Sequence, residues 1–383
     1  MPPVWAAFCF LPGVIGKLGR FPLAQTGAPV HSVPGLIGPL IVVSSVKSGR
    51  RTIMTMTIRE RTRLYCERDN KKAALSYFGT FAVYFSTLWL ALTNADSWII
   101  LIPMIVVNGL SGVRLYVLQH DCGHASLFET RQQNDRAGYG LSTFTLTPFR
   151  AMQSNHNDHH SHIGNLESRE AGEIFTMTLQ EWDQASALKR LKYRLYRNPF
   201  ILIPAGGLFT YAIRYRWPKN AMKIGAREIL LQNALVALWI ALIWLGFGST
   251  GLLVYFGTVL TAGMTGVWLV YLQHNFEDTY WDRKPDLNPT IAALQGSSAL
   301  DLGWLFDLAT GNIAYHDVHH FNARIPSYNL RRCHQDIRDE YDLRVIHWPE
   351  AMASFGLKLW DEENERLVPF PPANRKRPLP AGA

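Results

Sequence analysis

Cysteine is scarce in this sequence of 383 residues. Its four cysteines, Cys9, Cys66, Cys122 and Cys333, lie far apart and form no CxxC pair. This spacing excludes a disulfide-rich scaffold and a zinc ribbon held by cysteine. Charged residues are also few: they make up 18% of the chain, against 48% for hydrophobic residues. That balance is too apolar for a disordered protein.

Several signatures of common functions are missing as well. The net charge of +8 would suit an anionic partner, but the 38 Lys and Arg residues stand almost entirely outside the apolar runs. A nucleic acid is therefore not the expected partner. No HExxH motif is present, so the sequence does not indicate a zinc peptidase. GFGSTG at residues 246–251 matches the letters GxGxxG, but it lies inside a long uncharged run and not at a strand-to-helix turn, so it does not indicate flavin or nicotinamide binding.

Long runs without charge are the main positive feature. Residues 73–95, which include LSYFGTFAVYFSTLWLAL, carry no charge, and residues 229–276 form a second uncharged run divided by GFGSTG. About 20 apolar residues suffice for a helix to cross a bilayer. The sequence thus predicts an all-α integral membrane protein whose four spans form two hairpins. The expected spans are residues 75–95, 97–119, 229–247 and 251–273.

The distribution of basic residues predicts the orientation of these spans. The hairpin tips TNADS and GFGSTG contain no Lys or Arg, whereas residues 50–72 contain eight and residues 125–228 contain fourteen. By the positive-inside rule, both termini and the long middle segment are expected in the cytoplasm. A helical cap is expected on the cytoplasmic side of the membrane.

The two ends of the chain differ from this central part. Residues 1–56 mix Pro and Gly with weakly apolar sequence, and Met54 and Met56 precede a charged segment. We interpret them as a poorly ordered leader, or as residues upstream of the true start. Residues 57–350 are the expected catalytic domain. Residues 351–383 end in PFPPANRKRPLP and are expected to be a flexible tail.

Eight of the 13 histidines fall in three short clusters. The patterns are HxxxH, HxxHH and HxxHH, and on a helix positions i, i+3 and i+4 share a face. Buried imidazoles need a cation or solvent for their lone pairs. Eight nitrogen ligands exceed what one ion takes, so two metal ions are expected. Zn, Cu, Fe and Ni all suit imidazole. The clustered residues are His120, His124, His156, His159, His160, His316, His319 and His320.

Further candidates lie beside these clusters. His274, at the cytoplasmic end of the fourth span, is expected on the same membrane face; an ordinary interfacial histidine is the alternative. Carboxylates next to the candidate ligands can fix an imidazole tautomer, with solvated helix-face charge as the equal alternative. These carboxylates are Asp121, Asp158, Glu277, Asp278 and Asp317. The isolated His162, His334 and His347 are interpreted as ordinary core or surface residues.

The histidine patterns after paired hydrophobic hairpins resemble those of the membrane fatty acid desaturase superfamily. HNDHHSHIGNLESR, RLYRNPF, QHNFEDTYWD and TGNIAYHDVHHFNARIPSYNL resemble the bacterial acyl-lipid desaturases akin to the delta-12 and omega-6 group. The resemblance runs from about residue 60 to residue 350.

The resemblance implies a di-iron enzyme that uses O2 and two electrons to place a cis double bond in a fatty acyl chain. The implied ligands are the eight clustered histidines and His274. Some members hold an Asn-bound water one helical turn earlier, where this chain has Val270. No HPGG motif of a fused cytochrome b5 occurs, so the electrons come from a separate carrier, by family analogy ferredoxin or a b5-type protein.

Elementary chemistry agrees with this implication. An unactivated methylene has no acidic proton or electrophilic carbon, so a redox metal has to act on it. An acyl chain also needs a long apolar tunnel, for which Phe85, Trp268 and Tyr271 are candidate lining residues, with ordinary packing as the alternative for each. The basic residues Lys189, Arg190, Lys192, Arg194 and Arg197 suit an acidic carrier or anionic lipid headgroups.

Two competing functions remain open at this point. A hydroxylase or ketolase of the same superfamily would use the same histidines and iron. A metal transporter also places histidines in a membrane protein, but transport needs ligands near the bilayer midplane. All three histidine clusters fall outside the expected spans, which disfavours transport.

Overall fold

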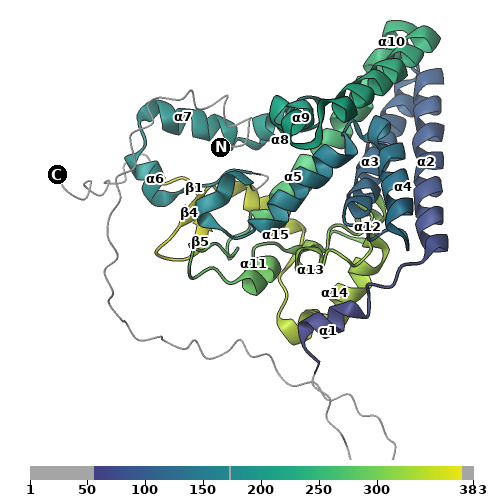
Figure 1. Ribbon diagram of the computed structural model, residues 1–383. Helices are drawn as coiled ribbons and strands as arrows, with labels where there is room; N and C mark the ends of the chain where they lie inside the picture. Colours follow the sequence, from purple (N-terminus) through teal and green to yellow (C-terminus); the bar gives the residue numbers. More distant parts are fainter. Residues whose placement is uncertain (1–55, 172–173, 373–383) are drawn as a thin grey trace, which may run out of the picture.

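The computed structural model describes residues 56–171 and 174–372, which are mostly helical (Figure 1). The α-helices before residue 213 are α1 (Ile58–Arg63), α2 (Asn70–Thr93), α3 (Trp98–Gly123), α4 (Arg131–Thr145), α5 (Phe149–Ser161), α6 (Leu179–Gln184), α7 (Ala187–Tyr196) and α8 (Pro199–Ala212). Those after it are α9 (Pro218–Ile224), α10 (Ala226–His274), α11 (Pro289–Gln295), α12 (Trp304–Thr310), α13 (His316–Phe321), α14 (Ser327–Tyr341) and α15 (Trp348–Ala353). The 3-10 helices of this part are η2 (Leu166–Ala171), η3 (Arg214–Arg216) and η4 (Ser354–Gly356).

Two small sheets correct the all-α prediction. Their strands are β1 (Met177–Thr178), β2 (Ala299–Leu300), β3 (Val345–Ile346), β4 (Leu359–Asp361) and β5 (Arg366–Val368). β4 lies between β1, to which it is parallel, and β5, to which it is antiparallel; β2 and β3 form a parallel pair. Strands of two or three residues are too short to show a period-2 hydrophobic pattern, so no sequence pattern predicts them.

Helices α2 and α3 form the first predicted hairpin. The carboxylate of Asp69 accepts hydrogen bonds from the backbone N–H groups of Lys71 and Lys72, which starts α2. Between the two helices, the buried amide of Asn108 donates to the backbone oxygen of Tyr84 at 2.5 Å and to Thr87 Oγ1 at 3.0 Å. A polar bond buried among apolar side chains fixes the register of the pair.

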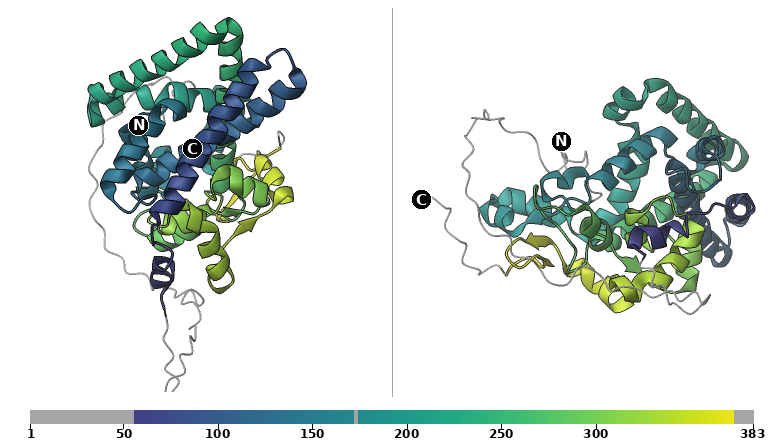
Figure 2. Two further views of the ribbon diagram at one scale, coloured as in Figure 1. Left: turned by 90° about the vertical axis from the view of Figure 1, so that its right-hand side faces the viewer. Right: turned by 60° about the horizontal axis from the view of Figure 1, so that its bottom comes forward.

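Helix α10 contains both of the remaining predicted spans. It runs for 49 residues, and Gly248 inside it has φ 61° and ψ −153°. A residue with a side chain rarely adopts such a positive φ, so the glycine of GFGSTG lets the chain change direction here. Figure 2 shows the bend at the top of its left view. Farther along, Gly207 of α8 and Gly263 of α10 pack so closely that a Cβ added to Gly207 would lie 2.6 Å from the backbone carbon of Gly263.

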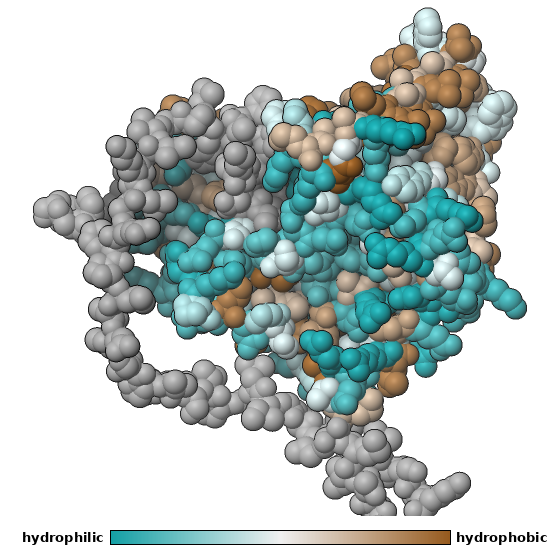
Figure 3. Space-filling view, in the orientation of Figure 1, coloured by the Kyte–Doolittle hydropathy of each residue, from teal (hydrophilic) through white to brown (hydrophobic). Residues whose placement is uncertain are grey.

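The outward faces of these long helices are apolar. Within the described residues, three helices are long and apolar enough to cross a membrane: α2, α3 and α10. Large side chains such as Leu75, Trp98 and Leu245 are at least 70% exposed, which is typical of a surface that meets lipid rather than water. In Figure 3 hydrophobic residues gather around the upper end of α10, and hydrophilic ones cover the opposite part. These features indicate membrane association.

The C-terminal region differs from the expected flexible tail. From residue 351 to residue 372 the chain completes α15 and forms η4, β4 and β5, and the side chains of Leu359, Trp360 and Leu367 are buried. These apolar side chains pack against Met177, Trp182, Tyr193 and Leu166, which gives this part of the chain a fixed position. Residues 373–383, with the basic end of the tail, and residues 1–55 of the predicted leader lie outside the described residues.

Candidate metal centre

Four helices bring the predicted histidines to one place. His120 lies in the last turn of α3 and His124 caps its C-terminus. Helices α5 and α13 carry three histidines each, and His274 is the last residue of α10. The i, i+3 and i+4 spacings place the three imidazoles of each short helix on one side, facing the other helices. The predicted clusters therefore lie next to one another in space.

The nine histidines divide into two groups. In each group the nitrogen atoms that could bind a metal lie within 4.8 Å of one another. Group I consists of His120, His124, His156, His160 and His319. Group II consists of His159, His274, His316 and His320. Helices α5 and α13 contribute to both groups, whereas α3 contributes only to group I and α10 only to group II.

The nitrogen spacing fits metal ions. In group I, His156 Nε2 lies 2.8 Å from the Nε2 atoms of both His120 and His160. In group II, His320 Nε2 lies 3.0 Å from His316 Nε2 and 3.2 Å from His159 Nε2. One nitrogen has a single proton or lone pair and cannot satisfy two such neighbours by hydrogen bonding. Two nitrogens bonded at right angles to one metal at about 2.1 Å are about 3.0 Å apart.

The electrostatics of the site also favour metal binding. Burial, and after it the charge of the neighbouring imidazoles, holds the pKa of six of these histidines well below the usual value. A neutral imidazole keeps the lone pair that a metal needs. The six are His124, His156, His160, His316, His319 and His320. Among the described residues, the buried Nε2 of His124 has no hydrogen-bond partner, as expected for a nitrogen that faces a metal.

The backbone orients His274. Its Nδ1–H donates to the carbonyl oxygen of Gly296 at 3.0 Å, which leaves Nε2 for a metal. Gly296 was not among the predicted site residues, because its contact with His274 arises only when the loop after α11 folds back on α10. No sequence motif signals it.

Two of the five predicted carboxylates lie in the centre. Asp121 is buried; its Oδ1 lies 3.4 Å from His120 Nδ1, and its Oδ2 accepts the backbone N–H of Ser327 at 2.8 Å. Asp317 is fully buried, with its carboxylate 3.1 Å from Nδ1 of the buried His334. His334, interpreted from the sequence as an ordinary core histidine, thus supports the segment that carries group II.

The other three carboxylates point away from the histidines, contrary to the prediction. Asp158 pairs with Lys223 at 2.8 Å, and Glu277 and Asp278 lie at the surface. There Glu277 pairs with Arg366 at 3.3 Å and Asp278 with Arg344 at 3.1 Å. Adjacency in sequence was misleading because neighbouring residues on a helix or turn point in different directions.

An apolar cavity opens onto both groups. Its walls include His120 and His156 of group I and His159, His274 and His316 of group II. Its empty volume, which includes space open to solvent, is about 980 Å³. Most other wall residues are apolar, among them Val113, Val117, Leu202, Val267, Leu269 and Val270. The apolar walls and the candidate metal ligands therefore face the same cavity.

The cavity is not lined by the aromatic residues proposed from the sequence. Trp268 packs against Phe306 and Trp348, and Tyr271 stacks on Phe355. Phe85 lies on a separate groove between α2 and α10. The aromatic wall residues are instead Tyr116, Tyr211 and Tyr215. No spacing in the sequence distinguished them from residues that only pack.

Known proteins are similar to this chain in sequence. The model of the family named fatty acid desaturase matches residues 96–350. A fatty acid desaturase of Bacillus subtilis (strain 168) is 32% identical over 309 residues, which are 80% of this chain and 88% of the relative. An sn-1 oleoyl-lipid 12-desaturase of Synechocystis sp. is 24% identical, covering 65% and 73%, and an sn-1 acyl-lipid omega-3 desaturase (ferredoxin) of Nostoc sp. is 25% identical, covering 71% and 77%. The chain therefore belongs to the fatty acid desaturase family, a family of oxidoreductases.

Proposed function

We propose that the protein introduces a cis double bond into a fatty acyl chain with O2, at a di-iron centre held by the nine histidines. One observation carries the proposal: groups I and II lie side by side in the wall of one apolar cavity. The names of the relatives, several of which act on acyl lipids, support an acyl lipid as the substrate.

The choice of iron follows from the chemistry of the substrate. Imidazole ligands suit several metals, but an unactivated C–H bond requires a redox-active one, which excludes zinc. When bound, a pair of iron ions supplies the oxidising power for removing two hydrogens. The protein supplies the rest: Gly296 fixes the ring of His274, and the low pKa of the buried histidines keeps them ready to bind.

The cavity positions the substrate. An acyl chain has no polar group near its middle, so the apolar walls select its depth by shape and exclude water from the reacting carbons. Tyr116 and Tyr215 satisfy each other through a hydroxyl contact of 2.9 Å. These two hydroxyl groups therefore bond to each other, and on that side the cavity wall presents mainly apolar atoms to the acyl chain.

The membrane arrangement is part of the proposal. Helices α2 and α3 would form one hairpin, and the two halves of α10, joined at Gly248, the other. Four spans then leave the histidines and both termini on the cytoplasmic side of a bacterial inner membrane, as the basic residues indicate. The electrons would come from a separate ferredoxin or cytochrome b5-type carrier, since two omega-3 relatives carry ferredoxin in their names.

Gas chromatography with mass spectrometry of fatty acid methyl esters tests the proposal. A host that expresses the protein should contain a new ester two mass units lighter than its parent, absent from a His319→Ala control. Disulfide adducts of the ester locate the double bond. An ester sixteen units heavier would instead establish a hydroxylase with the same metal site, and no new ester with either carrier supplied would refute both.

A further inference from the structure

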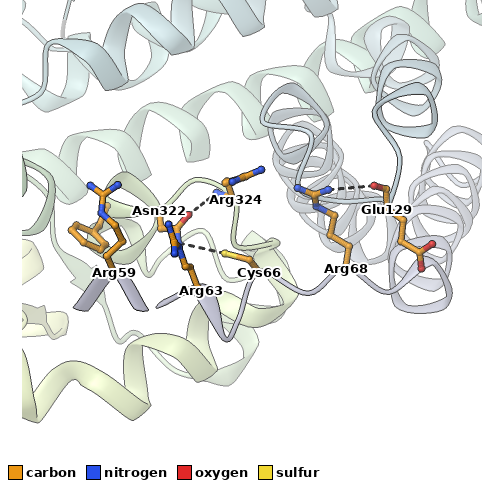
Figure 4. A pocket seen from close by; sticks show the side chains of 8 residues that line it. Arg59, Arg63, Cys66, Arg68, Glu129, Asn322 and Arg324 are labelled. Atoms are coloured by element: carbon orange, nitrogen blue, oxygen red, sulfur yellow. Dashed lines mark hydrogen bonds between the residues drawn. The ribbon is translucent and has the colours of Figure 1, made fainter. Parts of the chain in front are cut away.

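A second pocket, of different character, lies at the end of the helix α13 that carries His319 and His320 (Figure 4). Its empty volume is about 1,090 Å³, and α1, the loop after α1, the loop before α4 and the segment after α13 surround it. Its lining residues are Arg59, Arg63, Cys66, Arg68, Glu129, Phe321, Asn322 and Arg324. Nothing in the reaction on the acyl chain accounts for this pocket.

The pocket is strongly basic. Four guanidinium groups line it against the single carboxylate of Glu129. Arg59, Arg63 and Arg324 are exposed, and Arg68 donates to the backbone oxygen of Glu129 at 3.2 Å. Within residues 56–171 and 174–372, no carboxylate forms an ion pair with any of the four arginines. Their charge is therefore available to an anionic partner.

The floor of the pocket is continuous with the metal ligands. Asn322 follows the helix that carries His319 and His320, and its backbone N–H donates to the carbonyl oxygen of Val318 at 2.9 Å. Its side-chain amide contacts Thr62 Oγ1 at 3.2 Å and Cys66 Sγ at 3.4 Å. Asn322, in the wall of the pocket, therefore follows His320 of group II by two positions in the chain and His319 of group I by three.

The pocket faces away from the apolar spans. In Figure 1, α1 and α14 lie at the end of α2 opposite the turn between α2 and α3. This end carries Asn70, whereas the exposed apolar residues Leu75, Phe78 and Trp89 follow it along the helix. Lipid headgroups would meet the protein nearer the spans. A water-soluble macromolecule fits the position better than a lipid.

The basic residues of α7 are less suitable. Arg197 is fully buried, with bonds to Thr176 and Asn275, and Arg194 lies over the ring of Phe370 at 4.5 Å. Two of the five charges proposed from the sequence for carrier docking are therefore used within the protein. None of the five lies beside a histidine of α13.

We propose that the pocket formed by Arg59, Arg63, Arg68 and Arg324 is the docking site of an acidic one-electron carrier protein, with electrons entering through the segment His319–Asn322. The proposal rests on the proposed function. Each docking event oxidises one carrier by one electron. Two such electrons, two protons from water and the two hydrogens removed from the acyl chain reduce O2 to two molecules of water and leave one double bond.

Binding of an acidic [2Fe–2S] ferredoxin to the full chain in lipid nanodiscs tests the site directly. The pocket variant combines Arg59→Glu, Arg63→Glu and Arg324→Glu. The control combines Lys189→Glu, Arg190→Glu and Lys192→Glu on α7, which changes the net charge by the same amount. We expect the pocket variant to raise the Kd for ferredoxin about tenfold or more and to flatten its dependence on salt, and the control to leave both near the wild type.

Turnover with a small cationic donor, reduced methyl viologen, separates the two proposals. If the pocket variant forms product with the viologen at the wild-type rate but responds weakly to ferredoxin, the docking site is supported. Equal ferredoxin binding by wild type and pocket variant would overturn it, as would a larger loss in the α7 control. Absence of product with every donor would instead overturn the proposed function.

Discussion

The Nε2 atom of His160 lies 3.0 Å from the Nε2 atom of His319, although 159 positions separate them along the chain. This contact joins α5 to α13 inside group I. Buried, uncharged imidazoles gain little from meeting one another unless a cation lies between them. A metal ion bound by group I would therefore help to hold these two helices together, in addition to the apolar core.

Removal of a ligand should remove the metal. We expect His319→Ala to lose iron from group I and to reduce turnover by more than the ~10–100-fold typical of changes around a ligand. Iron per chain, measured by inductively coupled plasma mass spectrometry, checks this. His162→Ala is the matched control, because His162 lies outside both groups and bonds to the backbone oxygen of Asp158. Normal iron and turnover in His319→Ala would contradict the assignment.

Loss of His334 should weaken the fold near group II. His334 Nδ1 lies 3.2 Å from Oδ1 and 3.1 Å from Oδ2 of the fully buried Asp317, and without His334 the carboxylate keeps only the backbone N–H of Val318. We expect His334→Ala to lower the free energy of unfolding by about 1–3 kcal/mol, measured by chemical unfolding in detergent. His334→Gln, which can still donate a hydrogen bond, should restore part of it. The exposed His347→Ala should have little effect, and an equal loss there would argue against a special role for the buried pair.

Tyr116 should limit the length of chain that the cavity accepts. A smaller cavity lies beyond the first, and Val113, Tyr116 and Tyr211 line both. Tyr116→Ala would join the two and admit a longer chain. We expect the product preference for longer over shorter acyl chains to rise about tenfold or more, measured as methyl esters from mixed substrates. Tyr116→Phe keeps the ring and should keep the wild-type profile, as should Trp268→Ala. An unchanged profile in Tyr116→Ala would place the end of the chain elsewhere.

Lys358 should make stability depend on pH. Burial, and after it the charge of Arg197, lowers the pKa of Lys358 to about 7. The unfolded chain holds this proton up to about pH 10.4, so unfolding takes up a proton between these values. The contribution of Lys358 to the free energy of unfolding therefore rises with pH from about 7 to about 10 and is flat below.

Thermal unfolding of wild type and Lys358→Met in detergent measures this effect. The stability of the wild type relative to the variant should increase between pH 7 and pH 9, because groups common to both cancel in the comparison. The exposed Lys219→Met should show no such trend. A difference between wild type and Lys358→Met that stays constant with pH would mean that Lys358 is charged in the folded protein.

The sequence was informative where a pattern is local. The uncharged runs predicted α2, α3 and α10, and GFGSTG predicted the break at Gly248, because period, length and glycine act within one segment. The histidine spacings predicted which residues meet, since a helix fixes which positions share a face. His274 could be grouped with the clusters because it lies at the end of an expected span, on the same side of the membrane as the clusters.

Features set by contacts between distant segments were not predictable in the same way. Gly296 meets His274, and His334 meets Asp317, only after loops fold back. Asp158 was misplaced because Lys223, from another helix, attracts its carboxylate. The ordered residues 351–372 were mistaken for a tail, since the buried Leu359 and Leu367 belong to strands too short to show a pattern.

The division of α5 and α13 between the two groups links the two ions. A first ion that orders His156, His160 and His319 also sets the rotation of the helices that carry His159, His316 and His320. The second ion then meets ligands already in place and binds more tightly than it would alone. In a di-metal centre of the proposed kind, loading would therefore be positively cooperative, and the half-loaded protein would be sparsely populated.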